Sequence, residues 1–263
     1  MAQTQATARA GFKGLSEWPA LSAMRNRAVD EVSRQRVVRA FLSNAHLKAL
    51  PHEAVAALVG MGYEKTWLHG ECLLNYGERC NEIHIVLAGA LEASWISASG
   101  ARVTAEYIQP NEVINIIPAL DGQGALMDMR AHGTTTVFHI PREALLESFE
   151  LTPELMSAFL RLICSRSREQ YRRFRGAHLV NFRTRIAERL LDLARRYGRE
   201  VEGGVEIALK LSQDDLAALL GVSRQSINKE LRQFADLGWI GIRYGQLTIL
   251  DGESLKRLCE AGA

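Results

Sequence analysis

The stretch LSQDDLAALLGVSRQSINKELRQFADLGWIGIRYGQLTIL, residues 211–250, decides the fold of the C-terminal part of this chain. Ser212 is placed to cap a helix, and Asp215 completes a capping box with aspartate in place of the usual glutamate. Ala217 is small where a second helix must cross closely, and Gly221 supplies the backbone freedom for a sharp turn. The stretch therefore predicts a capped helix that ends in a tight turn.

A second helix is expected after this turn. Ser223 is placed to cap it, and Ile227 with Leu231 forms its inner face. Leu216 and Leu220 are the matching buried positions of the first helix. Two helices joined by a short turn that contains glycine form the helix–turn–helix arrangement, which the sequence therefore predicts.

Residues 239–249 extend this pattern with a two-stranded hairpin, known as a wing. The outer face of the second helix is polar and cationic over its first turns, where a recognition helix meets base edges. An arbitrary helical hairpin would match few of these features together. The residues expected to bind DNA are Ser212, Ser223, Arg224, Gln225, Ser226, Asn228, Lys229 and, in the wing, Arg243.

Upstream, residues 82–88 alternate in the period-two pattern of a β-strand. One face is expected to carry Ile83, Ile85 and Leu87, and the other Glu82, His84 and Val86. Gly89 is expected to mark a turn at the end of this strand.

The same period of two continues at Leu91, Ala93 and Trp95, which are expected to share a face. Ser99-Gly100 is a hairpin signal, and residues 134–140 form a last β-branched run. Short antiparallel strands at this spacing favour a sandwich, roll or barrel.

Pro153 suits the first turn of a long helix, where its missing N–H costs nothing. Leu155, Phe159 and Leu162 form a stripe that is expected to dock on the β domain. A second stripe has the spacing of a coiled-coil seam and consists of Met156, Leu160, Ile163, Ser167, Gln170 and Phe174. We expect this seam to join two copies of the chain, and packing within a single chain is the alternative.

The whole chain has 263 residues, is 47% hydrophobic and carries a formal charge of +2, which is ordinary for a globular protein. Residues 49–160 carry −9, and the arginine-rich residues 161–199 carry +9. A solvated helix face is one interpretation of this arginine run, and a functional surface is the other. Neither a secretory segment nor a membrane span is predicted, so we expect a cytoplasmic protein.

At this point the chain resembles the Crp/Fnr family from about residue 45 to 258. GVSRQSINKELRQF resembles its helix–turn–helix signature, and Gly77-Glu78 through Leu87-Ala88-Gly89 resembles a hairpin of its cyclic-nucleotide-binding-like β-roll. The resemblance implies an α+β fold and a homodimer that binds DNA, with a hinge around Leu179–Phe182. The domains expected on this basis are a partly disordered N-terminal tail (1–44), an antiparallel β-roll sensor (45–150), a dimerisation helix (151–178) and a winged helix–turn–helix (179–263).

Arg224, Gln225 and Lys229 match the three principal base-reading positions of the family. The cyclic-AMP-responsive members have Arg, Glu and Arg there, so only the first residue is kept. Arg224 can fork to guanine, whereas Gln225 suits adenine and Lys229 reaches guanine or phosphate. We expect an inverted-repeat operator with a changed half-site.

Nucleotide-binding members hold the ribose and cyclic phosphate with a Gly-Glu pair and an Arg-Ser or Arg-Thr pair. The corresponding positions here are Asn115-Ile116 and Leu126-Met127, and the adenine-contacting pair corresponds to Gln170-Tyr171. Without a cation, a phosphate in an apolar pocket is strongly disfavoured. Cyclic AMP and cyclic GMP are therefore not expected as effectors.

Apolar side chains around these positions leave two interpretations open. They line a pocket for an apolar effector, or they fill the space as core. The candidate pocket residues are Ile114, Asn115, Ile116, Leu126, Met127, Gln170 and Tyr171.

No cofactor or metal site is predicted. The four cysteines are Cys72, Cys80, Cys164 and Cys259, so the N-terminal cluster of the oxygen-sensing branch is missing. A haem ligand such as His84 or His132 is not expected, because a lone histidine is more often a surface or core residue.

An enzyme is not expected, because the sequence contains no GxSxG, phosphate-loop or HExxH motif. The alternative function is a β-roll module that regulates a protein partner, with weak or no specific DNA binding. Contacts with RNA polymerase, and activation as opposed to repression, stay open because no motif reports on them.

Overall fold

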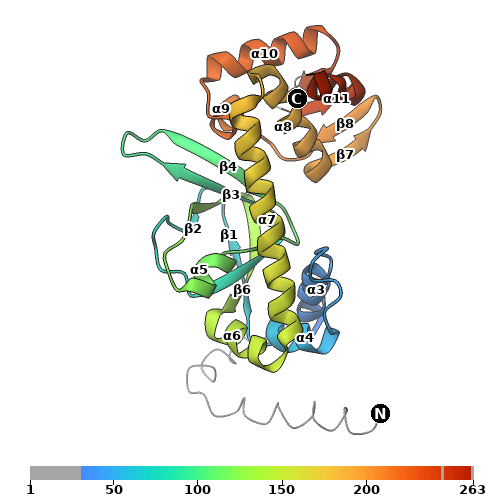
Figure 1. Ribbon diagram of the computed structural model, residues 1–263. Helices are drawn as coiled ribbons and strands as arrows, with labels where there is room; N and C mark the ends of the chain where they lie inside the picture. The colour runs from blue at the N-terminus through green and yellow to red at the C-terminus, as the bar shows by residue number, and fades with distance from the viewer. Residues whose placement is uncertain (1–30, 244–245, 262–263) are drawn as a thin grey trace. The chain divides into compact units, whose positions relative to one another are not determined.

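The computed structural model describes residues 31–243 and 246–261 (Figure 1). The predicted tail before residue 31 and the wing tip at residues 244–245 lie outside the described residues. The described chain forms two compact units. Of the described residues, the first unit takes 31–89, 110–126 and 131–164, and the second takes 90–109, 127–130, 165–243 and 246–261.

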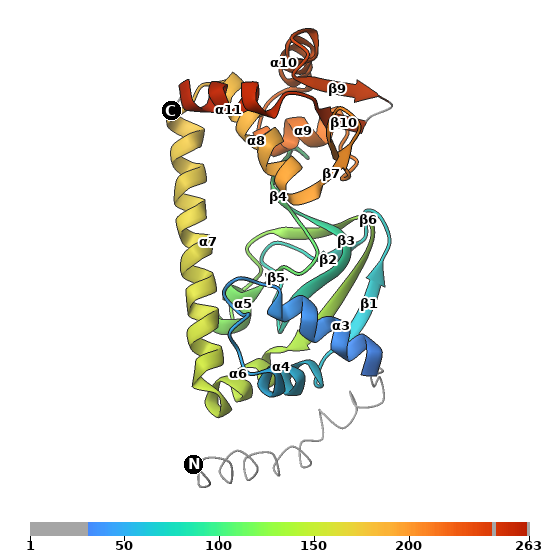
Figure 2. The ribbon, with the colours of Figure 1, turned by 90° about the vertical axis from the view of Figure 1, so that its right-hand side faces the viewer.

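An antiparallel sheet with short helices forms the part of the chain from residue 31 to residue 151 (Figure 2). The strands run in the order β1-β6-β3-β4, while β2 pairs with β6 and β5 pairs with β3. Its elements are α3 (Glu31–Leu42), α4 (His52–Val59), β1 (Tyr63–Trp67), β2 (Cys72–Leu74), β3 (Glu82–Ile96), β4 (Arg102–Ile108), β5 (Val113–Ile114), α5 (Ile116–Asp121), β6 (Asp128–Pro141) and α6 (Arg142–Leu151). The predicted hairpin at Ser99-Gly100 joins β3 to β4 and is confirmed.

Helix α3 corrects the prediction that residues up to 44 form a tail. Val37, Val38 and Phe41 are fully buried and belong to the main core of the first unit. This apolar stripe is short and lies among arginine and polar residues, so its helical period is weak in the sequence. The β-roll domain therefore begins earlier than residue 45.

Gly89 does not end a strand, because β3 continues without a break from Glu82 to Ile96. Its φ is +77°, a conformation that favours glycine, and a Cβ at this position would collide with the Thr134 carbonyl oxygen. The glycine thus bends a long strand against its neighbour and does not form a turn.

The predicted alternation of Leu91, Ala93 and Trp95 also fails. Leu91 and Ala93 are buried but Trp95 is exposed, and Ser94 is buried in its place. The pairing of β3 with β4 shifts register between Ala93 and Ser94. An irregularity of this kind transfers the following side chains to the opposite face.

Helix α7 (Pro153–Leu179) begins at the predicted proline. Leu155, Phe159 and Leu162 are buried against the core of the first unit, which confirms the predicted docking stripe. Among the described residues, no helix combines the length and the apolar character needed to cross a membrane.

The C-terminal part is a winged helix–turn–helix. It contains α8 (Phe182–Tyr197), β7 (Gly198–Val201), β8 (Gly204–Ile207), α9 (Gln213–Leu220), α10 (Arg224–Asp236), β9 (Ile240–Arg243), β10 (Gln246–Ile249) and α11 (Gly252–Ala261). The predicted wing, β9 with β10, packs beside α10 and belongs to a larger sheet in the order β7-β8-β10-β9 (Figure 2). The hairpin of β7 and β8 was not predicted, because its strands are only four residues long.

Candidate DNA-binding surface and sensor residues

The capping box of α9 has the predicted geometry. The Ser212 hydroxyl accepts a hydrogen bond from the Asp215 backbone N–H at 3.1 Å, and the Asp215 carboxylate accepts one from the Ser212 N–H at 2.9 Å. Gly221 ends the helix with φ +66°. Both ends of α9 are therefore satisfied by local hydrogen bonds, which fixes the angle at which α10 follows.

Helix α10 buries one face and exposes the other. Ile227, Leu231 and Phe234 are almost completely buried in the core of the winged domain. Ser223 caps the helix by accepting a hydrogen bond from the Ser226 N–H at 3.2 Å. Because these buried residues share one side of α10, the opposite side of its first turns is exposed, where a recognition helix contacts a groove of DNA.

Arg224, Gln225 and Lys229 lie on this exposed face. The Arg224 guanidinium forms an ion pair with the Asp214 carboxylate at 3.2 Å, and both side chains are more than 60% exposed. An exposed pair of this kind contributes about 0–1 kcal/mol. Arg224 can therefore leave Asp214 for a base at little cost.

The other predicted contact residues differ in whether their polar groups already have partners. Arg243, Ser212, Ser223 and Ser226 are all exposed. The Ser212 hydroxyl binds the Asp215 carboxylate, and the hydroxyls of Ser223 and Ser226 bind each other. Asn228 is half-buried, in contrast to its neighbours Gln225 and Lys229. Its Oδ1 is buried and has no hydrogen-bond partner within the described part of the chain.

Asp215 also binds a residue outside the helix–turn–helix. Arg102 of β4 donates to the Asp215 carboxylate at 2.7 Å, within the second unit. Burial raises the pKa of Asp215, but hydrogen bonds from Ser212 and Arg102 outweigh it and hold that pKa below its usual value. The capping carboxylate is therefore ionised at neutral pH.

We expect Ser212→Ala to lower the free energy of unfolding of the winged domain by about 1 kcal/mol, since the variant loses the cap of α9. Hydrogen exchange of the α9 amides measures this loss. Ser157→Ala, an exposed change inside α7, is the control and should leave α9 unchanged. Equal exchange in both variants would contradict a stabilising role for the cap.

Several arginines of the arginine-rich residues 161–199 have structural roles. Arg183 lies over the rings of Phe234 and Trp239, at 5.2 and 5.7 Å from the ring centroids. Arg185 donates to the Leu220 carbonyl oxygen at 2.9 Å, at the C-terminal end of α9. These side chains hold α8 against the helix–turn–helix.

Further arginines pair with carboxylates of the second unit. Arg173 and Arg196 both lie near the Glu106 carboxylate of β4, at 3.2 and 3.6 Å. Burial is the main reason why the pKa of Arg189 is lowered, and Asp192 partly compensates for it. A simple solvated helix face therefore does not describe this segment.

The candidate effector residues of the first unit do not all face inward. Ile114 and Ile116 are buried, whereas Leu126 is exposed. Asn115 adopts a left-handed conformation with φ +59° at the start of α5, and its amide is 2.9 Å from Nδ1 of His84. The remaining candidates, Met127, Gln170 and Tyr171, belong to the second unit, where Gln170 and Tyr171 are exposed.

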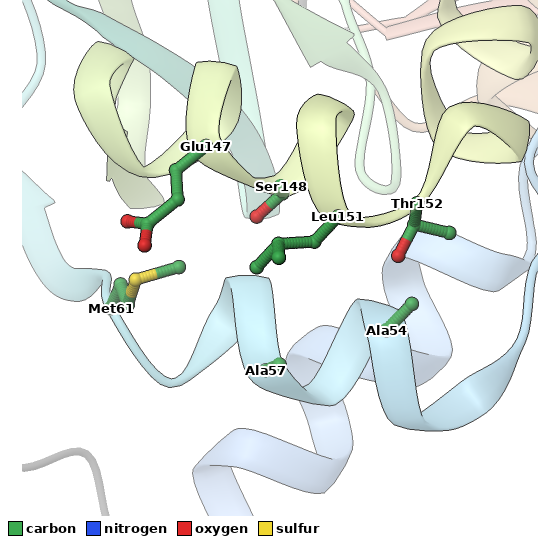
Figure 3. Close-up of a pocket in the computed structure, with 7 residues that line it drawn as sticks. All are labelled: Ala54, Ala57, Met61, Glu147, Ser148, Leu151 and Thr152. Atoms are coloured by element: carbon green, nitrogen blue, oxygen red, sulfur yellow. The ribbon is translucent and has the colours of Figure 1, made fainter. Parts of the chain in front are cut away.

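Two hollows among the described residues are both small. One of about 20 Å³ lies between α4 and α6 and is lined by Ala54, Ala57, Met61, Glu147, Ser148, Leu151 and Thr152. Figure 3 shows the Glu147 carboxylate pointing toward the Met61 side chain. The other, in the winged domain, is about 10 Å³. Each has room for about one water molecule, which is too little for an effector.

A cluster in the sheet was missed by the sequence analysis. Glu82 and His84 of β3 meet His139 of β6, and one potential ligand atom from each lies within 4.8 Å of the others. The shared face of Glu82 and His84 was predicted, but His139 is more than fifty residues away. Only the pairing of the strands brings it to this position.

Comparisons with known proteins match both parts of the chain. A family model described as a Crp-like helix-turn-helix domain matches residues 184–258, and one described as a cyclic nucleotide-binding domain matches residues 64–151. A CRP-like cAMP-activated global transcriptional regulator of Mycobacterium tuberculosis is 25% identical over 209 residues, which cover 78% of this chain and 91% of the relative.

Solved structures have the same fold. FixK2 from Bradyrhizobium japonicum has a TM-score of 0.67 at 19% identity, covering 75% of this chain and 96% of that one. A CRP/FNR family regulator from Thermus thermophilus has a TM-score of 0.65 at 24% identity, covering 76% and 100%. The two matched domains and the similarity to transcription regulators lead to one assignment: the chain belongs to the Crp/Fnr family and is a transcription regulator with a helix–turn–helix DNA-binding domain.

Proposed function

We propose that this protein acts as a cytoplasmic homodimer that recognises an inverted-repeat operator, and that its β-roll has lost the cyclic-nucleotide phosphate site. The observation that carries the proposal is the exposed face of α10, where Arg224, Gln225 and Lys229 project from the first turns. Arg224 suits guanine, Gln225 suits adenine, and Lys229 suits guanine or phosphate.

Selection of binding sites from random DNA with the purified protein, at a stated salt concentration, tests this function. We expect inverted repeats whose half-sites lie one helical turn apart, about 34 Å from centre to centre. Asymmetric sites, or no enrichment at low salt, would contradict the proposal. The second result would favour the β-roll as a regulator of a protein partner.

The exposed seam of α7 supports the dimer. Leu160 is 61% exposed and Phe174 is 67% exposed in the single chain, although both are large and apolar. Met156 lies on the same stripe and is also exposed. A parallel helix from a second copy would bury this stripe and give the twofold symmetry that an inverted repeat requires.

The changed roll supports the loss of the phosphate site. Asn115 binds His84, and Ile116 is buried in the core, so neither offers the carboxylate or the cation that a cyclic nucleotide needs. The exposed Leu126 is apolar as well. Although the Mycobacterium tuberculosis relative is named as cAMP-activated, the equivalent chemistry is absent at these positions.

Cyclic AMP and cyclic GMP are expected to leave the protein unchanged. Because the candidate residues cannot neutralise a phosphate, neither nucleotide should release heat in a calorimetric titration or change the affinity for the selected operator. A cyclic-AMP-activated relative measured in parallel is the positive control. Saturable binding of either nucleotide would refute the loss of the site.

Arg224→Ala is expected to reduce discrimination at one base pair of each half-site by about 1–3 kcal/mol, or roughly 5- to 150-fold. The lost contact is the guanidinium fork to guanine. Competition between operators that differ at single positions measures the change.

Two controls separate base reading from charge. Arg199→Ala removes the same charge from β7 and should keep the preference. Asp214→Ala removes the ion-pair partner of Arg224 and should preserve or improve affinity, because Arg224 no longer has to break this ion pair before it binds. An unchanged preference in Arg224→Ala would show that this residue does not read a base.

A further inference from the structure

We propose that Glu82, His84 and His139 form a binding site for a divalent transition-metal ion, with Zn²⁺ as the ion to test. Glu82 and His84 come from β3, and His139 comes from the neighbouring strand β6. The site lies within the first unit and does not depend on DNA binding.

The three side chains converge on one point. Oε2 of Glu82 lies 2.9 Å from Nδ1 of His139 and 3.5 Å from Nε2 of His84. Ligands placed tetrahedrally around Zn²⁺ at its usual bond lengths lie about 3.3 Å apart. Small side-chain movements are therefore enough to admit an ion between these atoms.

The burial and the chemical types of the three ligands determine which ions the site would favour. His84 and His139 are each only 3% exposed, whereas the Glu82 side chain is 25% exposed and gives access from solvent. Two imidazoles and one carboxylate favour zinc or another first-row transition metal over Mg²⁺ or Ca²⁺, which prefer oxygen ligands. Three protein ligands leave a coordination position open for water or an external ligand.

Neighbouring side chains contact all three of the proposed ligands. The Tyr63 hydroxyl donates to Oε1 of Glu82 at 3.0 Å, and the Tyr63 ring stacks on His139 at 4.7 Å. Asn115 is 2.9 Å from Nδ1 of His84, which leaves Nε2 facing Glu82. Outer hydrogen bonds of this kind are typical of metal sites, where they fix the orientation of the ligands.

Only one ring nitrogen of His139 faces the cluster. Its Nδ1 lies against the Glu82 carboxylate, whereas Nε2 is buried and, among the described residues, has no hydrogen-bond partner. Because the two nitrogens of an imidazole point in different directions, the ion would bind Nδ1 in place of its present contact with Glu82.

An ion in this site would also affect the position of α5. Asn115 is the residue just before α5 and binds His84 directly. A movement of the His84 ring when it coordinates the ion would therefore move Asn115 and the start of α5. This part of the chain corresponds to the nucleotide-binding segment of the family. This connection gives the metal a route to the rest of the sensor.

The test uses the full-length protein, stripped with a chelator and titrated with Zn²⁺ at pH 7 by calorimetry, with the metal content measured after dialysis. We expect one Zn²⁺ per chain, which excess Mg²⁺ does not displace. Co²⁺ in place of Zn²⁺ should give visible d–d absorption that reports nitrogen and oxygen ligands.

Glu82→Gln and His139→Gln should each weaken Zn²⁺ binding by at least about tenfold, because each removes a ligand. Tyr63→Phe keeps all three ligands but loses the hydrogen bond to Glu82, so it should weaken binding by about 10- to 100-fold even if the ligand variants fold poorly. Circular dichroism confirms that each tested variant is folded.

The matched control is a second histidine pair of the same unit, His69 and His132, whose rings are 5.6 Å apart. His69→Gln and His132→Gln should leave Zn²⁺ binding unchanged. Any one of three results would overturn the proposal. These are the absence of stoichiometric Zn²⁺ binding, unchanged Zn²⁺ binding in Glu82→Gln and Tyr63→Phe, and loss of Zn²⁺ binding in the control variants.

Discussion

Phe234→Ala is expected to lower the free energy of unfolding of the winged domain by about 3–5 kcal/mol. Phe234 is fully buried, and its ring centroid lies 5.4 Å from that of Trp239. Truncation leaves a cavity and also removes the ring on which Arg183 lies. DNA binding should weaken as well, because the orientation of α10 depends on this contact.

Native-state hydrogen exchange of the α10 amides measures the effect, since the chain has two units and its unfolding need not be a single transition. Leu237→Ala, an exposed change just after α10, is the control and should stay within about 0.5 kcal/mol of the unchanged protein. If both variants exchange alike, Phe234 is not a main support of the domain.

Leu160→Glu is expected to weaken dimerisation at least about 100-fold. The seam of α7 would lose one buried leucine from each copy and gain two carboxylates that repel each other. Because Leu160 is exposed in the single chain, the fold itself should be unaffected. Sedimentation at several protein concentrations measures the dissociation constant, and operator binding should fall in parallel.

Arg161→Glu provides the matched control, since it changes the charge at the neighbouring exposed position outside the seam. Its dimerisation should stay close to that of the unchanged protein. A Leu160→Glu variant that still forms the dimer would place the interface elsewhere and remove the support for the coiled-coil seam.

The winged domain was largely predictable because its signals are local. The capping serines Ser212 and Ser223, the positive φ of Gly221 and the spacing of Ile227 and Leu231 each act within about one or two helical turns. Helix α7 was predictable for the same reason, from Pro153 and its buried stripe. Here local propensity and tertiary packing favour the same structure.

The β-roll was less predictable because its details depend on contacts between distant strands. A glycine such as Gly89 occurs both in turns and in bent strands, so the local sequence does not distinguish the two. Only the close contact of its backbone with Thr134 of the neighbouring strand shows that it lies in a bent strand. The meeting of Glu82 with His139 likewise depends on sheet order. In the second unit, the ion pair between Arg173 and Glu106 joins residues far apart in sequence. The net charges of the segments therefore could not predict this pair.

The internal pairing of the arginines has a consequence for how DNA binding responds to ionic strength. A cation contributes to the salt dependence of affinity when it displaces counterions from phosphates. Arg173 and Arg196 already neutralise Glu106, and Arg183 is committed to the aromatic rings of its own domain. The logarithm of the affinity should therefore fall with the logarithm of salt concentration much less steeply than twelve arginines over residues 161–199 suggest.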